Sequence, residues 1–206
     1  TVNVGEVKVT VTGMGNYSGT LSDAAAYQIR PKAIQQSWIS VTPDVLTYSG
    51  SDLMPAVRVM DGDITLRADV DYELVYTDNR AVGTAKVTVT GKGNYTGAPT
   101  ASFQIVPNES SLSIALSPSD TVTCNGQNQR PALTVTSGSM TLDETEYTVT
   151  CLYNGTAIDP DAEFVNAGQY AITVNGTGSY LGATGTVFFT IAPAEFKVEP
   201  IPDQKY

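Results

Sequence analysis

The sequence predicts an all-β protein made of small antiparallel β-sandwiches in tandem, and three observations lead to this fold class. Hydrophobic residues make up 41% of the 206 residues and charged residues only 16%, so packed cores are expected. Apolar and polar residues alternate with period two, and no segment shows the period of an amphipathic helix. A turn rich in glycine and tyrosine recurs at Gly13–Gly19, Gly91–Gly97 and Gly176–Gly182.

The recurring turn is predicted to close a β-hairpin. Before the first copy, the segment VKVTV (residues 7–11) alternates as a strand with one solvated face does. The turn "GMGNYSG" follows, and its glycines supply the positive φ angles that tight turns need. A second strand then ends before a proline, at Pro31, Pro107 and Pro193 in the three copies, where a missing N–H does least harm. We interpret the motif as structural.

Upstream segments repeat as well. "VLTYSGSDLMPAVRV" (Val45–Val59) parallels "TVTCNGQNQRPALTV" (Thr121–Val135), and "ITLRADVDYELVY" (Ile64–Tyr76) parallels "MTLDETEYTVTC" (Met140–Cys151). The predicted division is the C-terminal half of a unit at 1–34, full units at 35–107 and 108–193, and the start of a further unit at 194–206. We expect the half unit to pair with the first full unit or with another molecule, or to leave its sheet edges exposed.

Composition argues against several functions. The formal net charge is −10 with an isoelectric point near 4.3, which disfavours nucleic acid and anionic membranes as partners. No run of 18 apolar residues occurs, so we expect no membrane insertion. The chain contains no histidine, which removes the commonest general base and metal ligand. We therefore expect no enzyme activity, no catalytic residue and no cofactor.

Three pairs of aspartates are the candidate metal ligands: Asp61 with Asp63, Asp69 with Asp71, and Asp159 with Asp161. Calcium prefers several carboxylates and carbonyls that converge from a loop. The third unit, however, has serines where the second has Asp61 and Asp63, and "DGD" is equally typical of a turn that bends at Gly62. We predict no metal site, and whether these loops bind calcium is left open.

The second unit reads "PAVRV … DYELVY … VGTAKVTVTGKGNYTG … FQI", and this pattern resembles the immunoglobulin-like repeats of large bacterial cell-surface proteins. The resemblance covers nearly all of 35–107, is good for 5–31 and looser for 108–193. It implies immunoglobulin-like sandwiches, an extracellular location on the bacterial surface, and a stalk that spaces or presents other domains. Its partners would be neighbouring repeats. The alternative is an adhesin module that binds host glycan or matrix protein.

The two cysteines occupy matching positions in the repeat, since Cys124 aligns with Tyr48 and Cys151 with Tyr76. If the tyrosines face each other, the third unit has exchanged an aromatic pair for two thiols. A disulfide between Cys124 and Cys151 is then predicted, with a chain-entropy stabilisation of about 3–4 kcal/mol. The implied extracellular setting would permit it. The alternative is two reduced thiols that act as small hydrophobic groups.

An insertion distinguishes the third unit. "LYNGTAIDPDAEFVNA" separates Cys151 from Gly168, where the second unit has only "TDNRAV" between Tyr76 and Gly83. Long loops on a rigid sandwich are common binding sites. The adhesin alternative would therefore use the 152–167 loop, with a contact patch of Tyr153, Asp159, Asp161 and Phe164. The other interpretation is a longer β-hairpin that strengthens one sheet.

Overall fold

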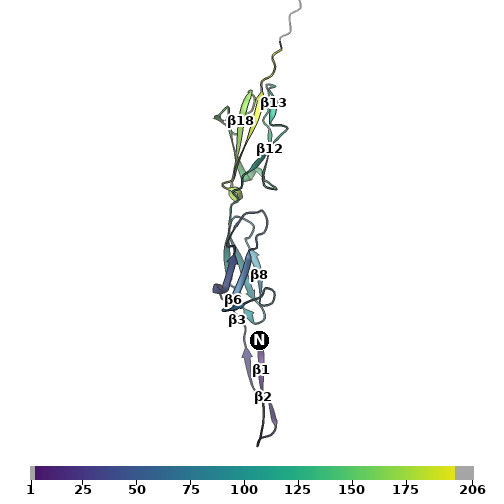
Figure 1. Cartoon of the computed structure of the whole chain (residues 1–206), viewed down its shortest axis with the longest axis vertical. Coiled ribbons are helices and arrows are strands. Elements are labelled where there is room, and N and C mark those ends of the chain that lie inside the picture. Colours follow the sequence, from purple (N-terminus) through teal and green to yellow (C-terminus); the bar gives the residue numbers. More distant parts are fainter. Residues whose placement is uncertain (1–2, 198–206) are drawn as a thin grey trace, which may run out of the picture. The chain divides into compact units, whose positions relative to one another are not determined.

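The computed structural model describes residues 3–197 (Figure 1). It is all-β, with no α-helix among these residues; its only helical turns are the 3₁₀ turns η1 (Gln36–Trp38), η2 (Glu144–Glu146) and η3 (Gly178–Tyr180). No helix in the described range has the length and apolarity to cross a membrane. The chain divides into two compact units between Val106 and Pro107. The segment 194–206, expected to start a further unit, lies largely outside the described residues.

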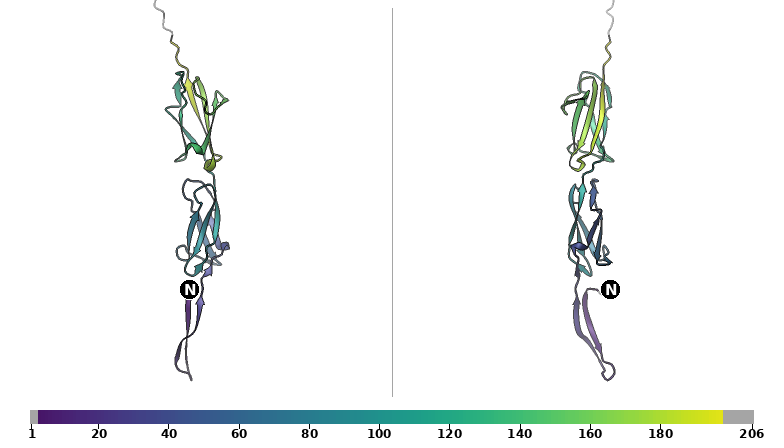
Figure 2. Two further views of the ribbon diagram at one scale, coloured as in Figure 1. Left: turned by 180° about the vertical axis from the view of Figure 1, so that it is seen from behind. Right: turned by 60° about the vertical axis from the view of Figure 1, so that its left-hand side comes forward.

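The first unit begins with a β-hairpin. Strands β1 (Gly5–Thr12) and β2 (Thr20–Ile29) run antiparallel and side by side (Figure 2), with a register shift between Val9 and Val11. Within the described residues neither strand pairs with a third, so both edges of this two-stranded sheet are open.

A β-sandwich follows in the same unit. Its larger sheet has the order β5 (Val45–Thr47), β11 (Thr100–Val106), β9 (Gly83–Gly91) and β8 (Tyr72–Thr77). The other sheet contains β4 (Ile39–Thr42), β6 (Ala56–Asp61) and β7 (Ile64–Thr65). Buried residues of both sheets, such as Val59 and Val89, share one core cluster. Because β5 runs parallel to β11, the larger sheet is mixed rather than wholly antiparallel as expected.

The second unit repeats this architecture. One sheet has the order β13 (Thr121–Thr123), β19 (Thr184–Ala192), β18 (Gly168–Gly176), β16 (Tyr147–Tyr153) and β17 (Thr156–Ile158). The other contains β12 (Ser113–Ser117), β14 (Ala132–Ser137) and β15 (Met140–Thr141). β13 again runs parallel to its neighbour β19. The predicted class of tandem immunoglobulin-like β-sandwiches is therefore confirmed.

The three predicted hairpins share one register. Gly5 lies opposite Ile29, Gly83 opposite Ile105, and Gly168 opposite Ile191. In each turn the second glycine has φ between +53° and +67° and the last glycine has φ between +88° and +101°, values that L side chains rarely adopt. The first glycine is needed for space, since a Cβ on Gly91 would lie 2.6 Å from the main-chain nitrogen of Thr96. These requirements explain why the motif recurs.

Two local predictions have clear outcomes. "DGD" forms the turn between β6 and β7, with Gly62 at φ +59°, and Gly138 takes the same place in the second unit at φ +58°. Trp38, expected within a strand, instead ends the 3₁₀ turn η1 just before β4. The indole packs against the core cluster that contains Val59.

Candidate functional site

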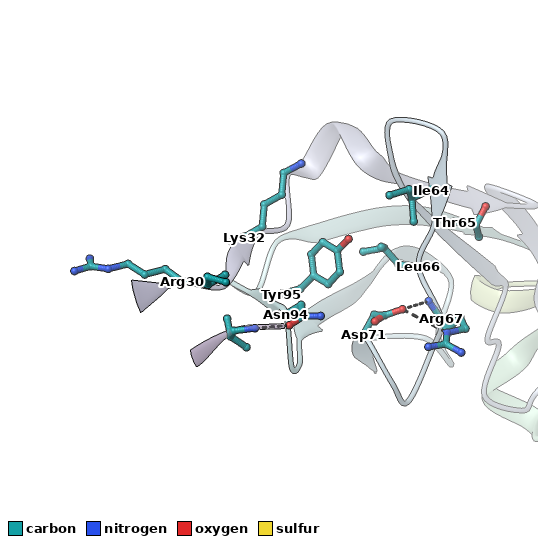
Figure 3. Close-up of a pocket in the computed structure, with 11 residues that line it drawn as sticks. Arg30, Lys32, Ile64, Thr65, Leu66, Arg67, Asp71, Asn94 and Tyr95 are labelled. Carbon is teal, nitrogen blue, oxygen red and sulfur yellow. Dashed lines mark hydrogen bonds and ion pairs between the residues drawn. The ribbon is translucent and has the colours of Figure 1, made fainter. Parts of the chain in front are cut away.

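A depression of about 400 Å³ lies where the β1–β2 hairpin meets the first sandwich (Figure 3). It is lined by Val4, Ile29, Arg30, Lys32, Ile64, Thr65, Leu66, Arg67, Asp71, Asn94 and Tyr95. In Figure 3 the ring of Tyr95 projects across the depression toward Leu66, whereas the side chain of Arg30 points away from it. The cavity belongs to the connection between hairpin and sandwich, so its chemistry depends on how that connection is held.

Asn94, in the repeated turn of the sandwich, holds this connection. The main-chain N–H of Lys32 donates to the carbonyl oxygen of Asn94 at 2.9 Å, and that of Ile34 donates to Thr96 at 2.9 Å. β3 (Lys32–Ala33) thereby pairs in parallel with β10 (Tyr95–Thr96). The side-chain oxygen Oδ1 of Asn94 accepts from the N–H of Val4 at 2.8 Å. Both chains that join hairpin and sandwich are thus bound to one asparagine.

The charged groups around the depression are paired within the unit. The Lys32 ammonium donates to both carboxylate oxygens of Asp61 at 2.7 Å and lies 5.0 Å from the ring centroid of Trp38. The hydroxyl of Tyr95 donates to Asp61 at 3.4 Å. Burial, followed by the charge of Asp61, raises the pKa of Tyr95. Lys32 and Asp61 therefore serve each other, and the ammonium is not directed at an open anion site.

The opposite wall carries a second pairing. The carboxylate of Asp71 accepts from the main-chain N–H of Arg67 at 2.9 Å, and its oxygen lies 3.8 Å from the guanidinium of the same residue. The carbonyl oxygen of Asp71 in turn accepts from the N–H of Lys92, in the repeated turn, at 2.8 Å. These bonds stabilise the 67–71 loop against the turn. They do not arrange a nucleophile beside a base.

The second unit holds its incoming chain in the same way. The N–H of Asn108 donates to the carbonyl oxygen of Ser179 at 2.8 Å, and Ser179 is the repeat equivalent of Asn94. Leu112 then donates to Thr184 at 3.0 Å and is buried. We call this arrangement the joint clamp: the carbonyl oxygen of Asn94 or Ser179 accepting from the residue that follows a unit-ending proline. Sequence reasoning missed it, although the constant position of these residues in the turn was the available signal.

The candidate metal ligands do not converge. Within residues 3–197 no group of three or more cysteine, aspartate and glutamate side chains is arranged to hold a metal ion. Asp61 is bound by Lys32, and Asp71 accepts from Arg67. Oδ1 of Asp159 accepts from the N–H of Asp161 at 2.8 Å, which is a local turn bond.

The predicted disulfide is not formed, because both cysteines carry free thiols in the structure. Cys151 is buried in a core cluster with Tyr170, and Cys124 packs against the same cluster. The thiol of Cys124 donates to the carbonyl oxygen of Val165 at 3.5 Å. Burial raises the pKa of the Cys151 thiol. The two residues meet as the repeat alignment implied, but as small hydrophobic groups rather than as a covalent pair.

The 152–167 insertion forms the longer hairpin. β16 continues into the turn Asn154–Gly155, whose φ angles are +45° and +82°, and β17 returns antiparallel along it. Asn-Gly is the preferred pair for such a two-residue turn. The N–H of Asn154 donates to the carbonyl oxygen of Gln169, and its side-chain oxygen accepts from the N–H of that residue. The insertion therefore widens the sheet.

The predicted contact patch of Tyr153, Asp159, Asp161 and Phe164 is not assembled on the surface. Phe164 is fully buried, with its ring stacked on Tyr170 at a centroid distance of 4.0 Å. The hydroxyl of Tyr153 donates to the carbonyl oxygen of Ala167 at 2.8 Å. Of the four, Asp159 alone is fully exposed. Phe164 faces inward because its apolar ring completes the core beneath the widened sheet.

Arg130 fixes the returning part of the insertion, and sequence reasoning missed it. Its guanidinium donates to the carbonyl oxygens of Pro160 and Ala162 and lies 5.2 Å from the ring centroid of Phe164. Asn128 adds a bond from the same loop, since its side-chain oxygen accepts from the N–H of Phe164 at 3.0 Å. The loop before β14 therefore holds the end of the insertion in place.

Comparison with known proteins adds little. No protein-family model matches the chain, and no curated protein matches it. Among solved structures it aligns with the fibronectin(III)-like modules of CbhA from Clostridium thermocellum, at 12% identity and a TM-score of 0.29, over 80% of this chain and 100% of that chain. Any functional proposal therefore rests on this chain's own residues.

Proposed function

We propose that the chain is a non-catalytic structural module of a bacterial cell-surface protein, which spaces or presents other domains. The observation that carries this proposal is the joint clamp in both units. β11 ends at Val106 and Asn108 is already bonded to Ser179, so Pro107 alone lies between the two fixed positions. A connector this short, with proline in it, has few conformations to lose under load.

Charge and composition are consistent with this role. A net charge of −10 keeps neighbouring copies apart and soluble. The absence of histidine from the sequence, and the internal pairing of the charged groups around the depression, support a non-catalytic module. The location on a bacterial surface rests on the resemblance of residues 35–107 to surface repeats, and neighbouring repeats are the partners that the clamp would hold.

The test is ¹⁵N relaxation of the intact chain beside a variant with Gly-Ser-Gly-Ser inserted between Pro107 and Asn108. In the intact chain, the amides of Lys32 and Asn108 should be as ordered as those of the strands, and both sandwiches should tumble with one correlation time. The insertion should separate the two correlation times while leaving both sandwiches folded. Independent tumbling of the sandwiches in the intact chain would count against the spacer.

An adhesin remains the second candidate, and an exposed apolar row supports it. Ala157, Leu152, Ala171 and Phe188 lie opposite one another across four neighbouring strands, and Leu152 and Phe188 are exposed. The row includes part of the insertion, although it differs from the patch expected there. Saturable binding to immobilised glycans or matrix proteins, lost in a Leu152→Ser/Phe188→Ser variant, would favour the adhesin. Silence from the folded chain would favour the spacer.

A further inference from the structure

The β1–β2 hairpin exposes side chains that the equivalent hairpins bury. Val9 is 38% exposed and Val11 is 54% exposed, whereas their repeat equivalents Val87 and Val89 are fully buried. The backbone is the same in both places, because Gly5 lies opposite Ile29 as Gly83 lies opposite Ile105. The first hairpin therefore has the shape of a core face without the other half of the core.

The aromatic positions show the same contrast. Tyr27 is 55% exposed while its equivalent Phe103 is 1% exposed. Tyr17, in the turn, is 79% exposed while Tyr180 is 1% exposed. The turn itself is complete, since Gly13 donates to Gly19 at 2.9 Å as Gly91 does to Gly97. What the hairpin lacks is a cover, not local structure.

The complete units specify the cover strand by strand. In the first sandwich, β8 pairs antiparallel with β9 over Tyr72–Thr77, and β5 pairs in parallel with β11, placing Leu46 opposite Ile105. The second sandwich does the same with β16 beside β18 and with β13 beside β19, where Val122 lies opposite Ile191. Both corresponding edges of the β1–β2 hairpin are open.

We propose that the β1–β2 hairpin is a receptor for strand complementation, and that its occupant is a polypeptide with the sequence pattern of residues 32–82. Such a segment supplies one strand antiparallel to Gly5–Thr12, one strand parallel to β2 at Ile29, and a second sheet over Val9, Val11 and Tyr27. Main-chain hydrogen bonds along two open edges give affinity, and the alternating apolar side chains set the register. The proposal goes beyond a spacer, because it assigns a binding partner to a particular face.

The test titrates the intact chain with a synthetic polypeptide of residues 32–82 and follows Tyr17 and Tyr27 by NMR. The expected result is saturable one-to-one binding that protects both rings. Val9→Asp places a charge on the covered face and should weaken binding at least about tenfold. Thr10→Asp, on the other face of β1, is the matched control and should leave binding within about twofold.

A fusion keeps the proposal testable if the free polypeptide aggregates. Residues 32–82 placed directly before Gly5, in place of residues 1–4, restore the junction of Val82 with Gly83 that the first sandwich has. The fused chain should gain a further cooperative unfolding transition and lose dye binding to the hairpin. A fused segment that stays protease-sensitive while Tyr17 and Tyr27 stay exposed would overturn the proposal. So would a dimer of the unmodified chain that Val9→Asp dissociates, since a second copy would then be the occupant.

Discussion

The main-chain N–H of Lys32 donates to the carbonyl oxygen of Asn94 at 2.9 Å, and Asn108 makes the equivalent bond to Ser179 at 2.8 Å. Each donor follows a proline that ends a unit, and each acceptor follows the second glycine of the repeated turn. The turn therefore closes its own hairpin and also binds the chain that enters the sandwich. Two duties in seven residues explain why the motif varies so little between units.

Gly91→Ala should destabilise the first sandwich and disturb its joint clamp. The new Cβ would lie 2.6 Å from the main-chain nitrogen of Thr96 and 2.8 Å from the Cα of that residue, so the turn must shift. We expect a loss of about 2–4 kcal/mol in the free energy of unfolding. Urea unfolding followed by the fluorescence of Trp38, the only tryptophan, measures this sandwich alone.

Gly62→Ala is the matched control for that variant. Gly62 also has a positive φ, but a Cβ there meets nothing within 4 Å. Its cost should be only the backbone strain of about 1 kcal/mol. Equal losses in the two variants would mean that the close contact with Thr96 relaxes freely, and that the first glycine of the turn is not required for space.

Fold class followed from the sequence because its signals are local. Period-two alternation, glycines with positive φ and the Asn154–Gly155 pair each report the backbone at their own positions. Repetition strengthened them, since three hairpins carry the same text. The parallel pairing of β5 with β11 was not predictable in this way, because it joins strands far apart in the sequence and leaves no local pattern.

The candidate site was less predictable, because burial and partner choice are tertiary properties. Phe164 looked like a loop aromatic in sequence, yet its ring stacks on Tyr170 inside the core. The joint clamp uses carbonyl oxygens of Asn94 and Ser179, and a carbonyl oxygen is present in every residue. Cys124 and Cys151 were correctly placed together, but proximity does not decide whether thiols oxidise.

The two thiols should differ in reactivity. Cys124 is partly exposed, whereas Cys151 is buried and its pKa is raised by desolvation, so less of its thiolate is present at a given pH. Iodoacetamide at pH 8 should therefore alkylate Cys124 first and Cys151 only after unfolding in urea. Mass spectrometry of tryptic peptides measures both sites. Two unreactive cysteines in the urea-unfolded, unreduced chain would reveal a disulfide and contradict the free thiols.

Alkaline pH should destabilise both sandwiches. Burial raises the pKa of Cys151 above 9.0 and those of Tyr72 and Tyr170 above 10.0, so in each case the folded state holds its proton more tightly than the unfolded chain does. The resulting stability is present below the unfolded pKa values and is lost as pH rises through the folded ones. Urea midpoints should thus be level from pH 7 to about 8.5 and fall from about pH 9 upward. Tyr72→Phe should reduce that fall in the first sandwich only, and an unchanged slope would remove Tyr72 as a contributor.

Arg130→Ala should loosen the end of the insertion without unfolding the second sandwich. The variant loses the bonds to the carbonyl oxygens of Pro160 and Ala162 and the contact with the ring of Phe164. We expect a loss of about 1–3 kcal/mol and faster amide hydrogen exchange in residues 159–164, with β18 and β19 unchanged. Arg130→Lys retains the charge but not the planar fork, so it should fall between wild type and alanine. If lysine restores the exchange rates fully, charge alone holds the loop, and the two carbonyl bonds are not what fixes it.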